Sequence, residues 1–187
     1  MHKAILLFLG IVVAAVSSAE DAKFTSAEEL QQKNPQEYAE AVAAYSTAQA
    51  AQPADTTPLG WTYTYYSGIT VSQWNTNYFS PTFNGIPSQG DPAKNITSLS
   101  YVAAPSYPLP GGFAPAISLL VYNSLGSLIG VISPLGANGY LTVASGRVPA
   151  NVPSNSQFVF RVNQSGGGTP TIQGAYNMGN QTLSVNY

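Results

Sequence analysis

Few side chains in most of this chain could perform acid–base, nucleophilic or metal chemistry. Between Thr56 and Tyr187 only four residues are charged, and that stretch has no histidine and no cysteine. Most enzymes need a titratable acid, base or nucleophile held beside a partner group. We therefore predict that the protein is not an enzyme. The four charged residues are Asp91, Lys94, Arg147 and Arg161.

The residues required for the common catalytic and metal sites are absent or isolated. Ser-His-Asp and Cys-His sites need a histidine, and the only one is His2. A glycosidase needs two carboxylates around one bond, whereas Asp91 is the only acid after Asp55. Zinc prefers histidine and cysteine, and calcium prefers several carboxylates. We expect no metal and no cofactor, with Asp91 and Lys94 in a solvated turn.

Aromatic residues and two isolated arginines are the candidates for a ligand or interface site. Aromatic side chains beside amides and hydroxyls line sugar-binding surfaces and anchor protein interfaces, although strand aromatics most often pack in a core. Arg147 and Arg161 could stack on a ring or bind a carboxylate partner, or simply face solvent. The aromatic candidates are Trp61, Tyr63, Tyr65, Tyr66, Trp74 and Tyr78.

Three Asn-X-Ser/Thr sequons could accept N-linked glycans in an exported chain. They begin at Asn95, Asn163 and Asn180. The alternative is coincidence, because the chain is rich in Asn, Ser and Thr.

The N-terminus has the pattern of a secretory signal peptide. Lys3 precedes an apolar run over residues 4–16, and small residues end at an expected cleavage site after Ala19. We assign residues 1–19 as the signal peptide and predict a secreted protein, extracellular or at the cell surface. An uncleaved anchor is the alternative, although the run is shorter than the roughly 20 residues of a membrane span. A secreted chain without cysteine must derive its stability from its core.

Residues 20–58 form an acidic region that we predict to be helical, followed by a linker. They contain seven acids and two lysines, a net charge of −5, whereas residues 59–187 have a net charge of +2. Two capping boxes are present, Ser26 with Glu29 and Asn34 with Glu37, and Pro35 is the first helical residue.

The second helix of this region has a narrow aromatic face. Tyr38, Val42 and Tyr45 recur at helical spacing together with Ala41. This face is too small for a core of its own. It could pack either on residues 59–187 of the same chain, which we call the body, or on a neighbouring subunit.

Residues 59–187 change to a period of two, which is typical of half-buried strands. Phe158, Phe160 and Val162 alternate with more polar residues, and a turn over residues 123–127 separates two apolar runs. We predict an all-β domain, a two-sheet antiparallel β-sandwich of the jelly-roll or Ig-like kind, preceded by the short α-helical segment. The expected strands cover 61–66, 69–79, 98–101, 116–122, 128–132, 140–144, 157–163 and 182–187.

These features predict a non-enzymatic structural or adhesive protein that assembles on a cell surface or in an extracellular matrix or filament. Low charge lets faces approach one another. A strand that ends at the last residue and a tethered N-terminal segment both suit edge pairing with a neighbour or other extracellular partner. A carbohydrate-binding module or lectin, with a glycan as ligand, is the first alternative. A small outer-membrane β-barrel is a further one, because the last strand ends in an aromatic residue. With so few basic residues, we expect no nucleic-acid partner.

Overall fold

The computed structural model describes residues 23–47, 55–57, 60–66, 68–84, 94–104, 115–135, 140–143, 151–166 and 171–187. The predicted signal peptide, Asp91 and Arg147 lie outside these residues. The elements, in chain order, are β1 (Lys23–Ser26), α1 (Ala27–Lys33), α2 (Pro35–Thr47), β2 (Asp55–Thr57), β3 (Gly60–Tyr65), β4 (Thr70–Gln73), β5 (Asn77–Phe79), β6 (Phe83–Asn84), β7 (Ser98–Ala104), β8 (Ala116–Tyr122), β9 (Leu128–Leu135), β10 (Tyr140–Val143), β11 (Gln157–Asn163), β12 (Thr171–Asn177) and β13 (Asn180–Asn186).

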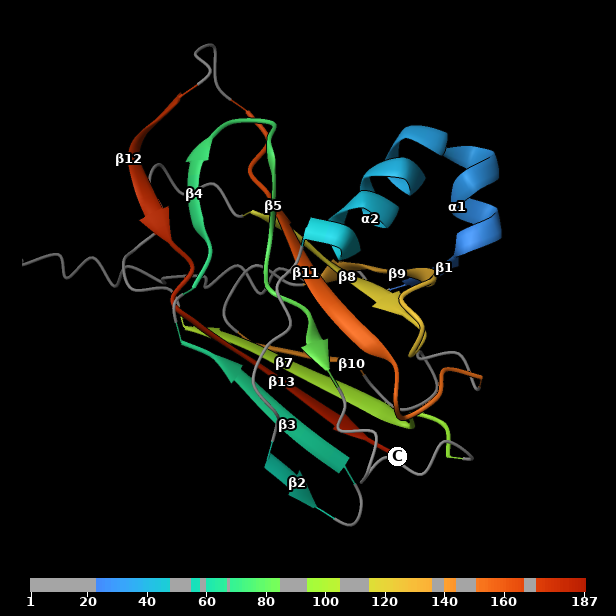
Figure 1. Cartoon of the computed structure of the whole chain (residues 1–187). Coiled ribbons are helices and arrows are strands. Elements are labelled where there is room, and N and C mark those ends of the chain that lie inside the picture. The colour runs from blue at the N-terminus through green and yellow to red at the C-terminus, as the bar shows by residue number, and fades with distance from the viewer. Residues whose placement is uncertain are drawn as a thin grey trace, which may run out of the picture.

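The strands form two main antiparallel sheets, with the helices over one of them (Figure 1). The first sheet has the order β1-β9-β8-β11-β5, and β6 also pairs with β11. The second sheet has the order β10-β7-β13-β3-β2, and β12 pairs with β4 in a small ribbon. The predicted all-β, two-sheet sandwich is therefore confirmed. The described strands form separate sheets and not a closed barrel, so the small outer-membrane barrel considered as a further alternative is not supported.

The main core lies between the two sheets. Along β11, Phe158, Phe160 and Val162 are buried in this layer, as their alternation predicts. Phe83 stands edge-on to Phe160, with ring centroids 5.0 Å apart. The apolar surface removed from water here is the main source of stability in a chain without cysteine.

The helices begin where the sequence predicts. The Ser26 hydroxyl accepts a hydrogen bond from the Glu29 amide at 3.2 Å, and the Asn34 side chain accepts one from the Glu37 amide at 3.3 Å. Both caps satisfy amide groups that a helix N-terminus leaves unpaired. None of the described helices is long and apolar enough to cross a membrane.

The helical segment packs on its own body, over the outer face of the first sheet (Figure 1). A second apolar cluster fills this layer, and both helices contribute to it. The sequence was consistent with docking on the body or on a neighbouring subunit. In the structure the helical segment docks on the body. The cluster contains Leu30, Ala41, Ala44, Leu120, Tyr122, Val131 and Val159.

Two features of the helical segment differ from the sequence prediction, and the predicted linker also contains the short strand β2. The buried face of α2 is centred on Ala41 and Ala44, flanked by Tyr38 and Tyr45, while Val42 is 44% exposed. Small residues let the helix approach the sheet closely, which turns the larger Val42 outward. The second difference is β1, a strand within the region predicted to be only helical; it forms an edge of the first sheet by pairing with β9.

Candidate functional site

The candidate site is a polar groove between α2 and the strands of the first sheet beneath it, which we call the α2 groove. It consists of two adjoining cavities that share Glu40 and Asn77. The first has a volume of about 330 Å³ and is lined by Asn34, Gln36, Glu37, Glu40, Asn77, Ala116, Ser118, Arg161 and Asn163. The second has a volume of about 450 Å³ and is lined by Glu40, Ala43, Ala44, Asn75, Thr76, Asn77 and Phe79.

Tyrosine contacts hold α2 in place above the sheet. The hydroxyl of the fully buried Tyr122 donates to the Ala41 carbonyl at 2.6 Å, and the Tyr45 hydroxyl donates to the Gln157 side chain at 3.1 Å. The two tyrosine rings pack with centroids 5.0 Å apart. Burial raises the pKa of the Tyr122 phenol strongly; nearby Arg161 opposes this effect and Tyr45 adds to it. These contacts fix one wall of the groove relative to the other.

Arg161 is the charged centre of the first cavity. Its Nη2 atom forms an ion pair with Glu37 of α2 at 2.5 Å and donates to the Ser118 hydroxyl at 3.0 Å. The Arg161 side chain is only 12% exposed. Glu37 also accepts a hydrogen bond from the Asn34 side chain at 2.9 Å. The helix cap is thus joined to the sheet through one carboxylate, which lessens the cost of burying the guanidinium.

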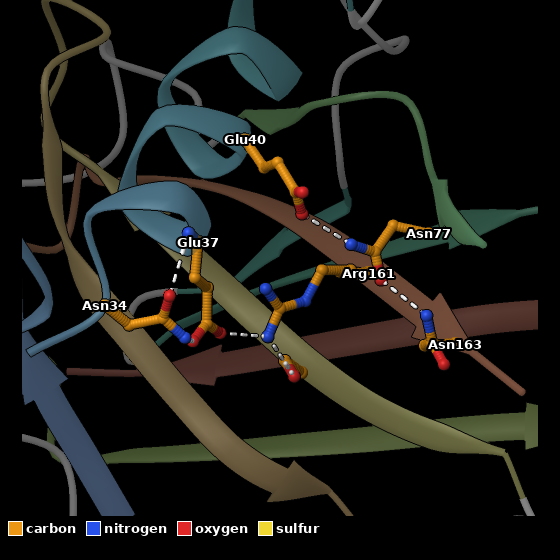
Figure 2. Close-up of polar contacts among 7 residues, drawn as sticks. Asn34, Glu37, Glu40, Asn77, Arg161 and Asn163 are labelled. Carbon is orange, nitrogen blue, oxygen red and sulfur yellow. Dashed lines mark hydrogen bonds and ion pairs between the residues drawn. The ribbon is translucent and has the colours of Figure 1, made fainter. Parts of the chain in front are cut away.

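A second set of side-chain hydrogen bonds crosses the groove at Glu40. The Asn77 side chain donates to Glu40 at 2.6 Å and accepts from the Asn163 side chain at 2.9 Å. Gln36 adds a longer bond to the other oxygen of Glu40, at 3.3 Å. Figure 2 shows Glu37 and Glu40 reaching from α2 towards Arg161 and Asn77 on the strands.

This arrangement suits binding better than bond-making. The groove residues include no histidine or cysteine, and each carboxylate is already hydrogen-bonded to an amide or paired with arginine. Among the described residues, no group of three His, Cys, Asp or Glu side chains could hold a metal ion. What the groove offers is a set of fixed donors and acceptors around one arginine and two carboxylates.

The aromatic candidates are divided between core and surface. Trp61 is 2% exposed, lies against Phe158 and donates its indole N–H to the Ser154 carbonyl at 3.2 Å. Tyr63, Tyr65, Trp74 and Tyr78 are partly buried against the main core. Tyr66, in contrast, is 77% exposed at the end of β3.

Tyr78 has a local structural role beside the β4–β5 turn. Its hydroxyl accepts from the backbone amides of Ser72 and Gln73 at 3.2 and 2.8 Å. Partial burial of the phenol favours a higher pKa, but these bonds and one with the Ser72 hydroxyl outweigh it, so the pKa of Tyr78 is lowered.

Only Arg161 and Asn163 of the other predicted site residues line the groove. Asn95 and Asn180 are exposed, and Asn163 is half-buried because its side chain bonds to Asn77. Lys94 is exposed and lies 5.4 Å from the centre of the Tyr187 ring.

The sequence did not mark Glu37, Glu40, Asn77 or Ser118 as site residues. A signal was nevertheless present in β8, whose residues Ile117 to Tyr122 are almost all apolar and are all buried. An unbroken apolar run indicates a strand covered on both faces. An arginine on such a covered face needs an acidic partner, and nearly all the acids lie between residues 20 and 55.

No protein-family model and no curated protein sequence matches the chain. Among solved structures, the chain is similar to the crystal structure of FlhE, with a TM-score of 0.50 and 17% sequence identity. The match covers 68% of this chain and 95% of the FlhE chain. At this identity the likeness concerns the fold.

This likeness contradicts the prediction of a secreted structural or adhesive protein and its lectin alternative. The structure supplies part of the physical reason. The helical segment, which could have packed on a neighbouring subunit, covers its own sheet, and Trp61, a ligand candidate for which core packing was the favoured alternative, is 2% exposed in the core.

Proposed function

We propose that this protein is an exported, non-enzymatic protein of the bacterial periplasm with a role in flagellar assembly. The observation that carries the proposal is the likeness to FlhE, a flagellar-associated protein, nearly all of whose chain is covered by the match.

Two features of the chain support export and action through binding. Residues 1–19 have the pattern of a signal peptide, which would direct the chain across the inner membrane. The α2 groove holds fixed polar groups and no nucleophile–base pair among its lining residues. We therefore assign the protein a role through contact with a partner, not through turnover of a substrate.

A deletion strain tests the proposal directly. Removing the gene from the bacterium that encodes it should reduce swimming in soft agar at an unchanged growth rate, and a plasmid copy should restore swimming. Osmotic shock should release the protein, cleaved after Ala19. A copy lacking residues 2–19 is the matched control, since it should stay in the cytoplasm and fail to restore swimming. Normal swimming and normal flagella in the deletion strain would refute the role.

A further inference from the structure

We propose that the α2 groove binds a primary ammonium group that has an amide carbonyl beside it and an apolar side chain. A peptide amino terminus and a free amino-acid amide both have this chemistry. The inference is independent of the flagellar role, because it rests on the charges, donors and cavities of the groove itself.

Glu40 is the acceptor for the ammonium group. The groove contains two carboxylates and one guanidinium, and Arg161 is paired with Glu37, so the charge of Glu40 is not compensated within the lining residues. Glu40 accepts from Asn77 and Gln36, whereas a carboxylate has about four acceptor positions. A bound ammonium would use the remaining positions and neutralise the groove, with a charge-assisted hydrogen bond.

Arg161 supplies the donors for the carbonyl oxygen. Both of its side-chain contacts with described residues, to Glu37 and Ser118, are made by Nη2. A guanidinium has five N–H donors in a fixed fork, so the donors on Nη1 and Nε are available to a ligand. A carbonyl fits them better than a free carboxylate, because a third carboxylate would be repelled by Glu37 and Glu40. Arg161 and Glu40 both line the first cavity, and Figure 2 shows Glu40 on α2 and Arg161 on the strand beneath it.

The second cavity suits the apolar side chain. It adjoins the first at Glu40 and Asn77, and Ala43, Ala44 and Phe79 supply apolar surface along it. Its volume of about 450 Å³ lies within the usual range of small-ligand pockets, roughly 300–1,000 Å³. An ammonium bound at Glu40 would therefore have polar partners on one side and an apolar cavity on the other.

Titration calorimetry of the full chain with leucinamide tests the site. Leucinamide should bind, while N-acetyl-leucinamide, which has no charge, and glycinamide, which has no side chain, should each bind several-fold more weakly. Glu40→Gln should weaken leucinamide binding about tenfold or more, because it removes the charge of the acceptor. The glutamine keeps an oxygen for the Asn77 bond, so the fold should be retained. Glu28→Gln is the matched control: it removes the same charge from an exposed position on α1 outside the groove, and binding should be unchanged.

A capped peptide separates the two sources of the ligand. Tighter binding of Leu-Gly-Gly-amide than of leucinamide would identify a peptide amino terminus, and equal binding would identify a free amine. No binding of leucinamide to the wild-type protein would overturn the inference. Equal binding by a folded Glu40→Gln variant, or stronger binding of the acetylated ligand, would overturn it as well.

Discussion

At the scale of single residues, Gln181 is the clearest unsatisfied group. It is the second residue of β13, is fully buried, and neither amide atom has a hydrogen-bond partner among the described residues. Leaving a buried polar group unpaired costs about 1–3 kcal/mol. Gln181→Met keeps the length of the side chain and removes both polar atoms. We expect this variant to raise the free energy of unfolding by about 1 kcal/mol or more, measured by urea denaturation.

Gln157 provides the contrasting substitution. Its side chain accepts from Tyr45 and donates to the Ser124 carbonyl, so Gln157→Met should lower the free energy of unfolding. If Gln181→Met also lowers it, the Gln181 amide has partners in solution, such as ordered water, and our interpretation of this side chain is wrong.

Which residues form the groove could be predicted only in part. Arg161 stands out in the sequence because the body has so few charges. Its partner Glu37 is 124 positions away, and pairs of that separation depend on how α2 lies on the sheet. Local spacing predicts the helix that carries Glu37 through its capping box, but not the strand that the helix covers.

At the scale of elements, the docking of α2 depends on close packing. Ala41 has no exposed surface, whereas Ala39, half a turn away, is exposed. Ala41→Glu would bury a carboxylate without a partner or force the helix off the sheet. We expect it to lower the free energy of unfolding by more than about 2 kcal/mol.

Ala39→Glu is the matched control, since the same change on the exposed face should alter stability by no more than about 0.5 kcal/mol. Thermal unfolding and light scattering of both variants check this prediction. Equal stability of the two proteins would mean that the helix does not lie on the sheet through Ala41.

The edge strand β1 depends on a glycine in β9. A Cβ atom at Gly130 would collide with the Phe24 ring and the Thr25 carbonyl. Gly130→Ala should therefore lower the free energy of unfolding by about 1–3 kcal/mol through overpacking. Hydrogen exchange should show loss of protection in β1, while the exposed control Ser127→Ala should leave both properties unchanged. Retained protection of β1 in Gly130→Ala would contradict this pairing.

Strand prediction succeeded where a local signal was strong. The turn over residues 123–127 is visible in the sequence because Asn, Gly and Ser separate two apolar runs, and β8 and β9 pair across it as predicted. The four residues of β1 have no comparable signal. They form a strand because β9 offers them an unpaired edge, a condition that exists only in the folded protein. Likewise β12, whose pairing with β4 is irregular, lacks a clean period of two.

At the scale of the whole molecule, the charges and the sheets are arranged in layers. Described acids lie mainly on the two helices, and the strands beneath supply amides, hydroxyls and Arg161. Ion pairs among the described residues accordingly occur within α1, between Lys33 and Glu29, or between α2 and the first sheet. The hydrogen bond and charge of Lys33 lower the pKa of Glu29. This pair lies at the surface, with the Lys33 side chain 72% and the Glu29 side chain 35% exposed, so screening by solvent leaves it little influence on stability.

The dependence of stability on alkaline pH should therefore reflect buried tyrosine. Burial raises the pKa of Tyr122 above the ordinary value of 10.0. The unfolded chain then releases a proton near pH 10 that the folded chain still holds. The contribution of Tyr122 is complete below about pH 10 and is lost as the pH rises above it. Tyr122→Phe should be less stable at neutral pH, because the bond to Ala41 is gone, but its stability should decline less steeply above pH 10.

Tyr78 has the opposite effect on the pH dependence of stability. Its pKa is lowered in the folded state, so ionisation of Tyr78 favours folding at alkaline pH and offsets part of the loss from Tyr122. Tyr78→Phe should consequently show a steeper alkaline decline than the wild-type protein. Urea unfolding of the three proteins at a series of pH values from neutral to strongly alkaline measures the slopes, and tyrosinate absorbance follows the ionisation. Identical slopes in all three would show that neither phenol differs in pKa between the folded and unfolded chain.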